Sequence, residues 1–77
     1  MSTMKADIEI GQRAFAELMR IFKTPKKAIM RTGISKSTLY KWKEGYTPNG
    51  LGLLRMHYAG ADVIYILTGK RSKTEVQ

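Results

Sequence analysis

Glycines at four positions divide the later part of this chain into short segments. Each of these glycines directly follows a segment with helical periodicity. Glycine readily adopts the left-handed backbone conformation in which many helices end. Residues that favour helix starts stand just before the same segments, among them Thr24, Ser35 and Asp62. This punctuation predicts several short helices in the later part of the chain. The glycines are Gly33, Gly45, Gly60 and Gly69.

The first expected helix covers residues 7–22 and is amphipathic, with Asp7 as its N-cap. Its apolar stripe has spacings of three, four and seven. The stripe comprises Ile8, Phe15, Leu18 and Phe22, and the polar residues between them are Arg13, Glu17 and Arg20. A second helix is expected over Pro25–Thr32, because proline suits the first position of a helix.

Ser35 is expected to cap a third helix over residues 36–44, in which Leu39 and Trp42 share the buried face. Either Thr47 or Asn49 caps a fourth helix, which ends near Ala59. The apolar residues expected to be buried in the fourth helix are Leu51, Leu54 and Tyr58. A last short helix covers Val63–Leu67, with Asp62 as its cap.

The chain has 77 residues and no region of strand-like alternation, apart from a weak hint near Val76. This length suits one domain. The expected fold is therefore all-α, a compact bundle of about five short helices, with a folded core over residues 6–69 and a flexible basic tail over residues 70–77. The longest apolar run, Val63–Leu67, is too short to span a membrane, and no signal-type stretch opens the chain, so a cytoplasmic protein is expected.

The inventory of reactive side chains argues against an enzyme and against a metal site or cofactor. The chain has no Cys and one His, His57. Disulfide frameworks, zinc fingers and thiol catalysis are therefore excluded. No nucleophile, base and orienting group stand together in the sequence. His57 is expected to be a partly exposed helix residue.

Positive charge is concentrated in one window. The chain has 14 Lys and Arg against 6 Asp and Glu, and seven of those cations lie within residues 23–43, where there is no acid. A solvated cationic surface would account for this pattern. It also suits a polyanion, because clustered cations release the counterions of a nucleic-acid backbone.

The segment GISKSTLYKWKEG, residues 33–45, resembles the helix-turn-helix DNA-binding domains of the Cro and phage-repressor type. A second segment, ADVIYILTGKR at residues 61–71, resembles the last helix of phage-repressor N-terminal domains. Three positions depart from the family pattern, since Pro25, Ile29 and Thr32 stand where Gln, Ala and Leu are usual. The resemblance implies a lambda-repressor-like fold whose recognition helix, residues 36–44, occupies operator DNA as a transcriptional regulator.

Physical chemistry and the resemblance assign the same roles to the expected third helix. Lysine donates to guanine, serine bonds to several base edges, and tyrosine packs on a thymine methyl group. The expected base-reading residues are Lys36, Ser37, Tyr40 and Lys41. Phosphate contacts position the domain without reading sequence, and they are expected from Lys23, Lys26, Ser35, Lys43 and Thr47. Trp42 could be a stacking platform for a base, but it shares the buried stripe with Leu39, which favours a core position.

The last helix carries more apolar residues than one buried face can hold, so Ile64 and Tyr65 are expected to be exposed. The resemblance implies a homodimer through this region, bound to a pseudo-palindromic double-stranded operator. Two alternatives remain open. One is a protein-interaction module on the same scaffold, such as an antitoxin or an antirepressor, and the other is a sequence-neutral nucleic-acid-binding protein.

Overall fold

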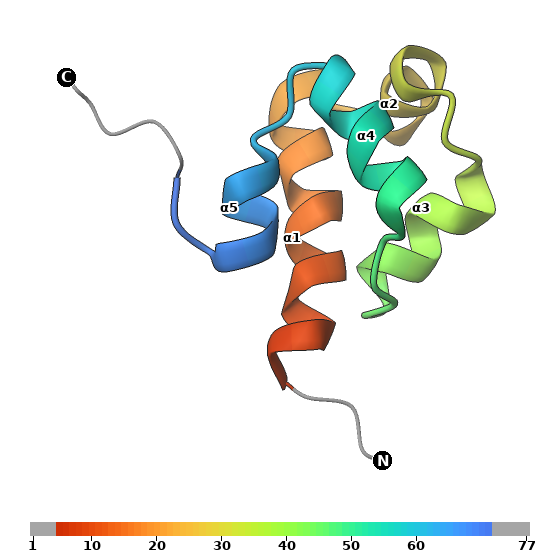
Figure 1. Ribbon diagram of the computed structural model, residues 1–77. Coiled ribbons are helices and arrows are strands. Elements are labelled where there is room, and N and C mark those ends of the chain that lie inside the picture. The colour runs from red at the N-terminus through yellow and green to blue at the C-terminus, as the bar shows by residue number, and fades with distance from the viewer. Residues whose placement is uncertain (1–4, 72–77) are drawn as a thin grey trace, which may run out of the picture.

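Five α-helices and no strand make up the part of the chain that the computed structural model describes, residues 5–71, with side chains from Ile8 onward. The helices are α1 (Lys5–Phe22), α2 (Pro25–Thr32), α3 (Lys36–Lys43), α4 (Gly50–Tyr58) and α5 (Val63–Thr68) (Figure 1). The expected all-α bundle of five short helices is confirmed. The expected tail lies outside the described residues from Ser72 onward.

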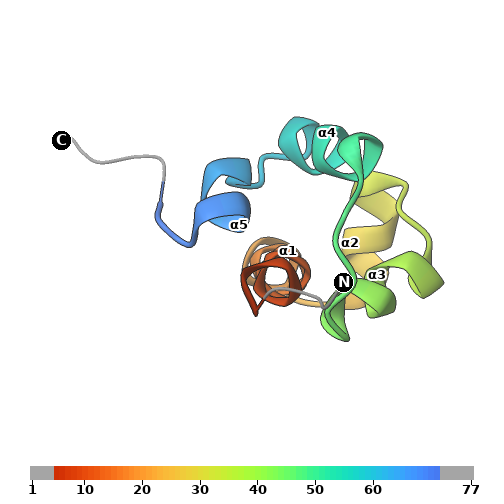
Figure 2. The same ribbon diagram turned by 60° about the horizontal axis from the view of Figure 1, so that its bottom comes forward.

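Helix α1 is the central element of the bundle. It contacts α2, α3 and α5, while α4 contacts α2 and α5. A view almost along α1 shows α5 on one side of it and α2 and α3 on the other (Figure 2). The core therefore forms around α1, and its buried apolar residues are Ala14, Leu18, Ala28, Ile34, Leu39, Trp42, Met56, Ala61 and Ile66.

The predicted caps of the later helices are confirmed. Backbone N–H groups donate to the side chains of Thr24 (from Lys27, 3.2 Å), Ser35 (from Thr38, 3.2 Å) and Asp62 (from Tyr65, 3.0 Å). For α4 the cap is Asn49, whose Oδ1 accepts from the Gly52 N–H at 2.8 Å, and not Thr47. Each cap pairs one of the backbone donors that a helix start leaves without an intrahelical partner.

The prediction for the first helix was wrong in two respects. Asp7 lies inside α1, which spans Lys5–Phe22, so Asp7 is not its N-cap. Glu17, expected on the polar side, is 1% exposed, whereas Ile8 from the expected apolar stripe is 36% exposed. The reason is that α1 has neighbours on several sides, so its buried surface is wider than one apolar stripe.

The prediction for the buried face of the fourth helix, α4, was also wrong. Leu51, Leu54 and Tyr58 are 56%, 47% and 79% exposed, and the buried residues of α4 are Gly52 and Met56. A Cβ added at Gly52 would lie 2.8 Å from Cζ2 of Trp42, so the helix backbone lies directly against the indole ring. This close approach fixes the rotation of α4 and turns Leu51 and Leu54 outward, while Leu53 packs against the core.

Glu17 is buried because it is paired on three sides. Its carboxylate accepts hydrogen bonds from Arg20 (2.9 Å), from Arg71 (2.8 Å) and from the Asp62 backbone N–H (2.9 Å). The Arg71 guanidinium also lies over the Tyr65 ring, 3.9 Å from its centroid. The folded structure thus extends to residue 71, two residues beyond the expected boundary at residue 69.

These bonds predict a measurable dependence of stability on pH. The neighbouring guanidinium of Arg20 above all, with the Asp62 N–H and Arg71, lowers the pKa of Glu17 from 4.5 to about 2, although burial alone would raise it. Because the pKa is lower in the folded state, the stabilisation is complete above about pH 4.5 and is lost as the pH falls towards 2. We expect Glu17 to contribute on the order of 3 kcal/mol at neutral pH.

The measurement is the free energy of urea unfolding of wild type and of Glu17→Gln from about pH 7 to about pH 2, which includes the range in which carboxylates titrate. We expect the variant to be less stable at neutral pH and the two proteins to converge at the acid end. Parallel curves would show that the Glu17 carboxylate does not carry this stabilisation.

Candidate nucleic-acid interface

Helices α2 and α3 are joined by three residues, Gly33, Ile34 and Ser35. Gly33 has a φ of 76°, and its N–H donates to the Ile29 carbonyl at 2.9 Å. Ile34 is 5% exposed and anchors the turn in the core, and Ser35 begins α3. The two helices are thereby held in one unit, the α2–α3 unit (residues 25–43).

Thr32, one of the departures from the family pattern, has a specific place in this turn. It is 8% exposed, its hydroxyl donates to the Ala28 carbonyl at 2.7 Å, and it accepts from the Ile34 N–H at 3.1 Å. The hydroxyl therefore pairs two backbone groups at the end of α2, where an apolar residue would leave them to other partners.

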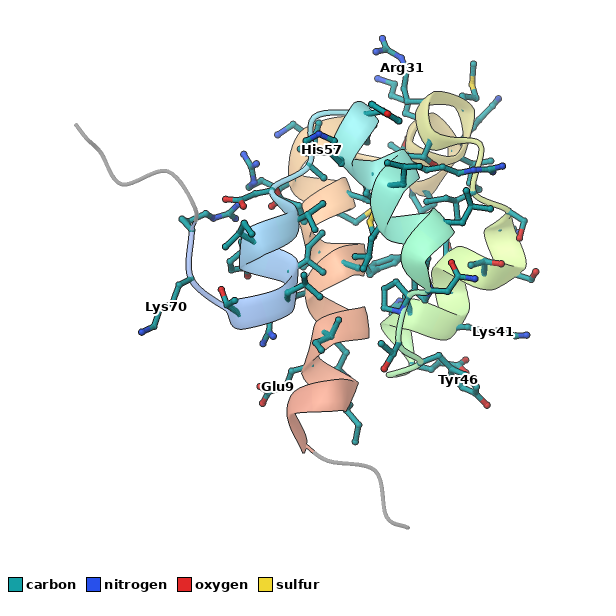
Figure 3. The ribbon with its side chains drawn as sticks, viewed as in Figure 1. Glu9, Arg31, Lys41, Tyr46, His57 and Lys70 are labelled. Atoms are coloured by element: carbon teal, nitrogen blue, oxygen red, sulfur yellow. The ribbon has the colours of Figure 1, made fainter. Side chains whose placement is uncertain are left out.

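The predicted division of α3 into a buried and an outer face is confirmed, except at Tyr40. Leu39 and Trp42 are 1% and 3% exposed, so Trp42 is a core residue. On the other face Lys36, Ser37 and Lys41 are exposed. Lys41 points away from the body of the molecule (Figure 3).

Tyr40, also expected to read bases, is half-buried. Its ring lies 5.8 Å from that of Phe15 on α1, and Nζ of Lys43 lies 5.7 Å from the Tyr40 centroid and 5.3 Å from that of Phe15. Both side chains therefore rest against α1 at one edge of the outer face. The three exposed residues Lys36, Ser37 and Lys41 are more accessible than Tyr40.

Two surface hollows flank α3. The first, about 420 Å³, has Lys36 and Tyr40 on its α3 side and is completed by Pro25, Lys26, Ile29 and Met30 of α2. The second, about 430 Å³, lies between α3 and the start of α4, and its polar residues include Ser35, Thr38, Lys41, Thr47 and Arg55. Hydrogen-bond donors thus continue beyond the outer face of α3 on both sides.

The residues expected to contact phosphate are exposed but not equivalent. Lys26 shares the first hollow with Lys36, and Ser35 and Thr47 line the second. The Ser35 hydroxyl is already engaged as the α3 cap. Lys23 ends α1 in a left-handed conformation (φ 76°), and its Nζ donates to the Arg20 carbonyl at 3.1 Å.

Arg55 belongs to this region, although the sequence did not single it out. Its Nη1 donates to the Gly33 carbonyl at 2.9 Å, so α4 is tied to the turn between α2 and α3. The two residues are 22 positions apart, and no local pattern connects them. We infer that Arg55 positions the turn.

Arg55→Ala is therefore expected to weaken the fold without removing a core side chain. A hydrogen bond from a charged donor contributes about 1.5–3 kcal/mol, and the exposure of Arg55 places the expected loss near the lower figure. The measurement is the free energy of unfolding by chemical denaturant for wild type, Arg55→Ala and Arg55→Gln, the last of which keeps a shorter hydrogen-bond donor. Equal stability of wild type and Arg55→Ala would rule out this role.

Salt bridges are not distributed evenly over the molecule. All four salt bridges found among the described residues use arginines outside the window 23–43, namely Arg13, Arg20 and Arg71. No carboxylate of the described residues forms a salt bridge with a cation of the α2–α3 unit or with Lys23. Among the described residues, the cations of α2 and α3 thus have no salt-bridge partner, and the same holds for Lys23, Arg55 and Lys70.

The residues expected at a dimer interface have different environments. Ile64 is 51% exposed and shares a hollow of about 580 Å³ with Leu54 and His57. Tyr65 is half-buried, with the Arg71 guanidinium over its ring. Ile64 is therefore accessible to a second molecule, whereas Tyr65 is largely used within the fold.

Among the side chains that the structure describes, residues 8–71, no group of His, Asp or Glu could hold a metal ion. No helix in the same range has the length and apolar character needed to cross a membrane. Comparison of the chain with family models, curated proteins and solved structures finds no match.

Proposed function

We propose that the chain is a sequence-specific double-stranded DNA-binding regulator that occupies operator sites through α3, with α2 and α3 acting as a helix-turn-helix. One observation carries the proposal. The seven cations of residues 23–43 have no salt bridge to a described carboxylate, and two of them, Lys36 and Lys41, lie on the polar, exposed outer face of α3. A surface of this kind matches the charge of DNA and the donor pattern needed in its major groove.

The proposed roles follow from the positions of the side chains. Lys36, Ser37 and Lys41 read base edges, and Tyr40 contributes from the edge of the same face. Lys23, Lys26, Ser35, Lys43 and Thr47 contact phosphates and set the register. Contacts of the second kind add affinity and salt dependence without sequence preference.

A homodimer would suit this mode of binding. Two copies related by a twofold axis read half-sites about one helical turn apart, roughly 34 Å. Exposed Ile64 and Leu54, at the hollow between α4 and α5, provide an apolar contact for the second copy.

A protein-interaction module is the second candidate, and one observation favours it. Helix α4 exposes an apolar stripe of Leu51, Leu54 and Tyr58. Stripes of this kind mark surfaces that bind other proteins. In that case removal of the α4 stripe would abolish function, while removal of the α3 lysines would not.

The experiment is the affinity for the best-bound duplex selected from random DNA sequences, as a function of salt, measured by fluorescence anisotropy. The matched variants are Lys41→Ala and Lys70→Ala, which remove the same charge from opposite sides of the molecule (Figure 3). We expect log K to fall linearly with log salt, with a slope of about −0.9 for each phosphate contacted. Lys41→Ala should weaken binding more than Lys70→Ala. Equal effects of the two variants would contradict a DNA interface on α3.

A further inference from the structure

A fourth hollow, away from the outer face of α3, lies where the end of α1 meets α2. Its volume is about 710 Å³, and we call it the α1–α2 hollow. Its apolar residues are Ile21 and Phe22, both half-buried, and Met30, which is 73% exposed. Its remaining residues are the cations Lys23, Lys26, Lys27 and Arg31.

The charge of this hollow is uncompensated. No acidic residue lines it, and none of its four cations forms a salt bridge within the described residues. Lys23 contributes one of these four positive charges. Its backbone is in the left-handed conformation, in which glycine would be less strained. Arg31 lies at the edge of the molecule, well apart from Lys41 (Figure 3). The hollow is thus distinct from the face proposed to read bases.

We propose that the α1–α2 hollow binds an acidic segment of a partner protein, in which Asp or Glu side chains flank a large apolar side chain. The carboxylates would pair with Lys27 and Arg31, and the apolar side chain would lie on Phe22 and Met30. Charge complementarity selects the acidic partner, because charged patches associate with patches of opposite sign.

The apolar floor favours protein over DNA as the occupant. A nucleic-acid backbone offers phosphate and sugar oxygens to cations, and it would leave the exposed Met30 side chain without an apolar partner. A membrane surface requires apolar side chains that extend beyond the cations into the acyl region. Here Ile21 and Phe22 are half-buried between the charged residues.

Occupancy would also affect DNA binding, a consequence that rests on the proposed function. Lys26 and Met30 line both the α1–α2 hollow and the hollow beside Lys36 and Tyr40. A segment bound in the α1–α2 hollow would therefore withdraw Lys26 from phosphate contact. We expect it to lower the affinity for duplex DNA at every sequence.

The test begins with selection of random phage-displayed peptides on the full-length protein in the absence of DNA. We expect enriched peptides to carry Asp or Glu around Leu, Phe or Trp. Synthetic copies are then titrated against Met30→Gln and Lys27→Gln/Arg31→Gln, with Lys41→Gln and Lys70→Gln as controls. We expect a loss of about tenfold or more for both hollow variants and less than about twofold for the controls.

Three results would overturn the proposal. The first is that the enriched peptides lack acidic residues. The second is that the synthetic peptides bind equally to the hollow variants and to the controls. The third is that no peptide is selected, while the hollow variants alone lose affinity for random duplex DNA or for phosphatidylserine vesicles. Competition by the peptide against duplex DNA is a separate measurement. If the protein bound the peptide but no DNA, the proposed function would be contradicted, while the proposal of a peptide site in the α1–α2 hollow would still stand.

Discussion

Gly11→Ala is expected to destabilise the protein by about 3 kcal/mol, since overpacking a tight contact typically costs about 1–3 kcal/mol or more. Gly11 is buried in α1, and a Cβ there would collide with the carbonyl oxygen of Tyr46 and lie 2.9 Å from that of Trp42. Both neighbours are backbone atoms and cannot rotate away. Helix α1 would have to withdraw from the chain segment that follows α3.

Thermal unfolding followed by far-UV circular dichroism provides the measurement. We expect a decrease in the melting temperature of roughly 15 °C, because a small domain loses about 4–8 °C for each kcal/mol. Gly50→Ala is the matched control, since a Cβ at Gly50 meets no heavy atom within 4 Å. The control should be neutral or slightly stabilising. Equal melting temperatures of the two variants would show that α1 does not depend on this close approach.

Lys41→Ala and Lys43→Ala are expected to weaken DNA binding in two different ways. Lys41 is exposed on the outer face of α3. Its loss should cost roughly 1–3 kcal/mol at one base pair and relax the preference there. Lys43 lies against the rings of Phe15 and Tyr40 at the edge of that face. Its loss should weaken binding to all sequences alike and reduce the salt slope by about one.

The measurement is the affinity of each variant for a set of duplexes that differ from the best site by one base pair, at two salt concentrations. Lys70→Ala, on the opposite side of the molecule from Lys41 (Figure 3), controls for the loss of one charge. If Lys41→Ala and Lys43→Ala gave the same pattern, the division into reading and positioning residues would be wrong.

Helix ends were predictable from the sequence because capping is local. Thr24, Ser35 and Asp62 each pair with a backbone N–H only three residues further along the chain. The outer face of α3 was predictable for the same reason, since Leu39 and Trp42 define the buried side within one helix.

Burial that depends on a second element was not predictable from local pattern. The local pattern predicts Glu17 to be a polar surface residue. Its burial involves pairing with Arg71, which lies 54 positions away in the sequence. The rotation of α4 is fixed by the contact of Gly52 with Trp42, and glycine carries no signal of the face it occupies. The role of Arg55 at the Gly33 carbonyl depends on the same long-range packing.

Selection of bound sites from random duplex DNA, at near-physiological salt, tests the central claim most directly. A reading face on α3 predicts recovery of a consensus, with two related half-sites about one helical turn apart if the protein binds as a dimer. The same selection with Lys36→Ala/Lys41→Ala should return a weaker and altered consensus. Recovery of no consensus by the wild-type protein would contradict sequence-specific DNA recognition.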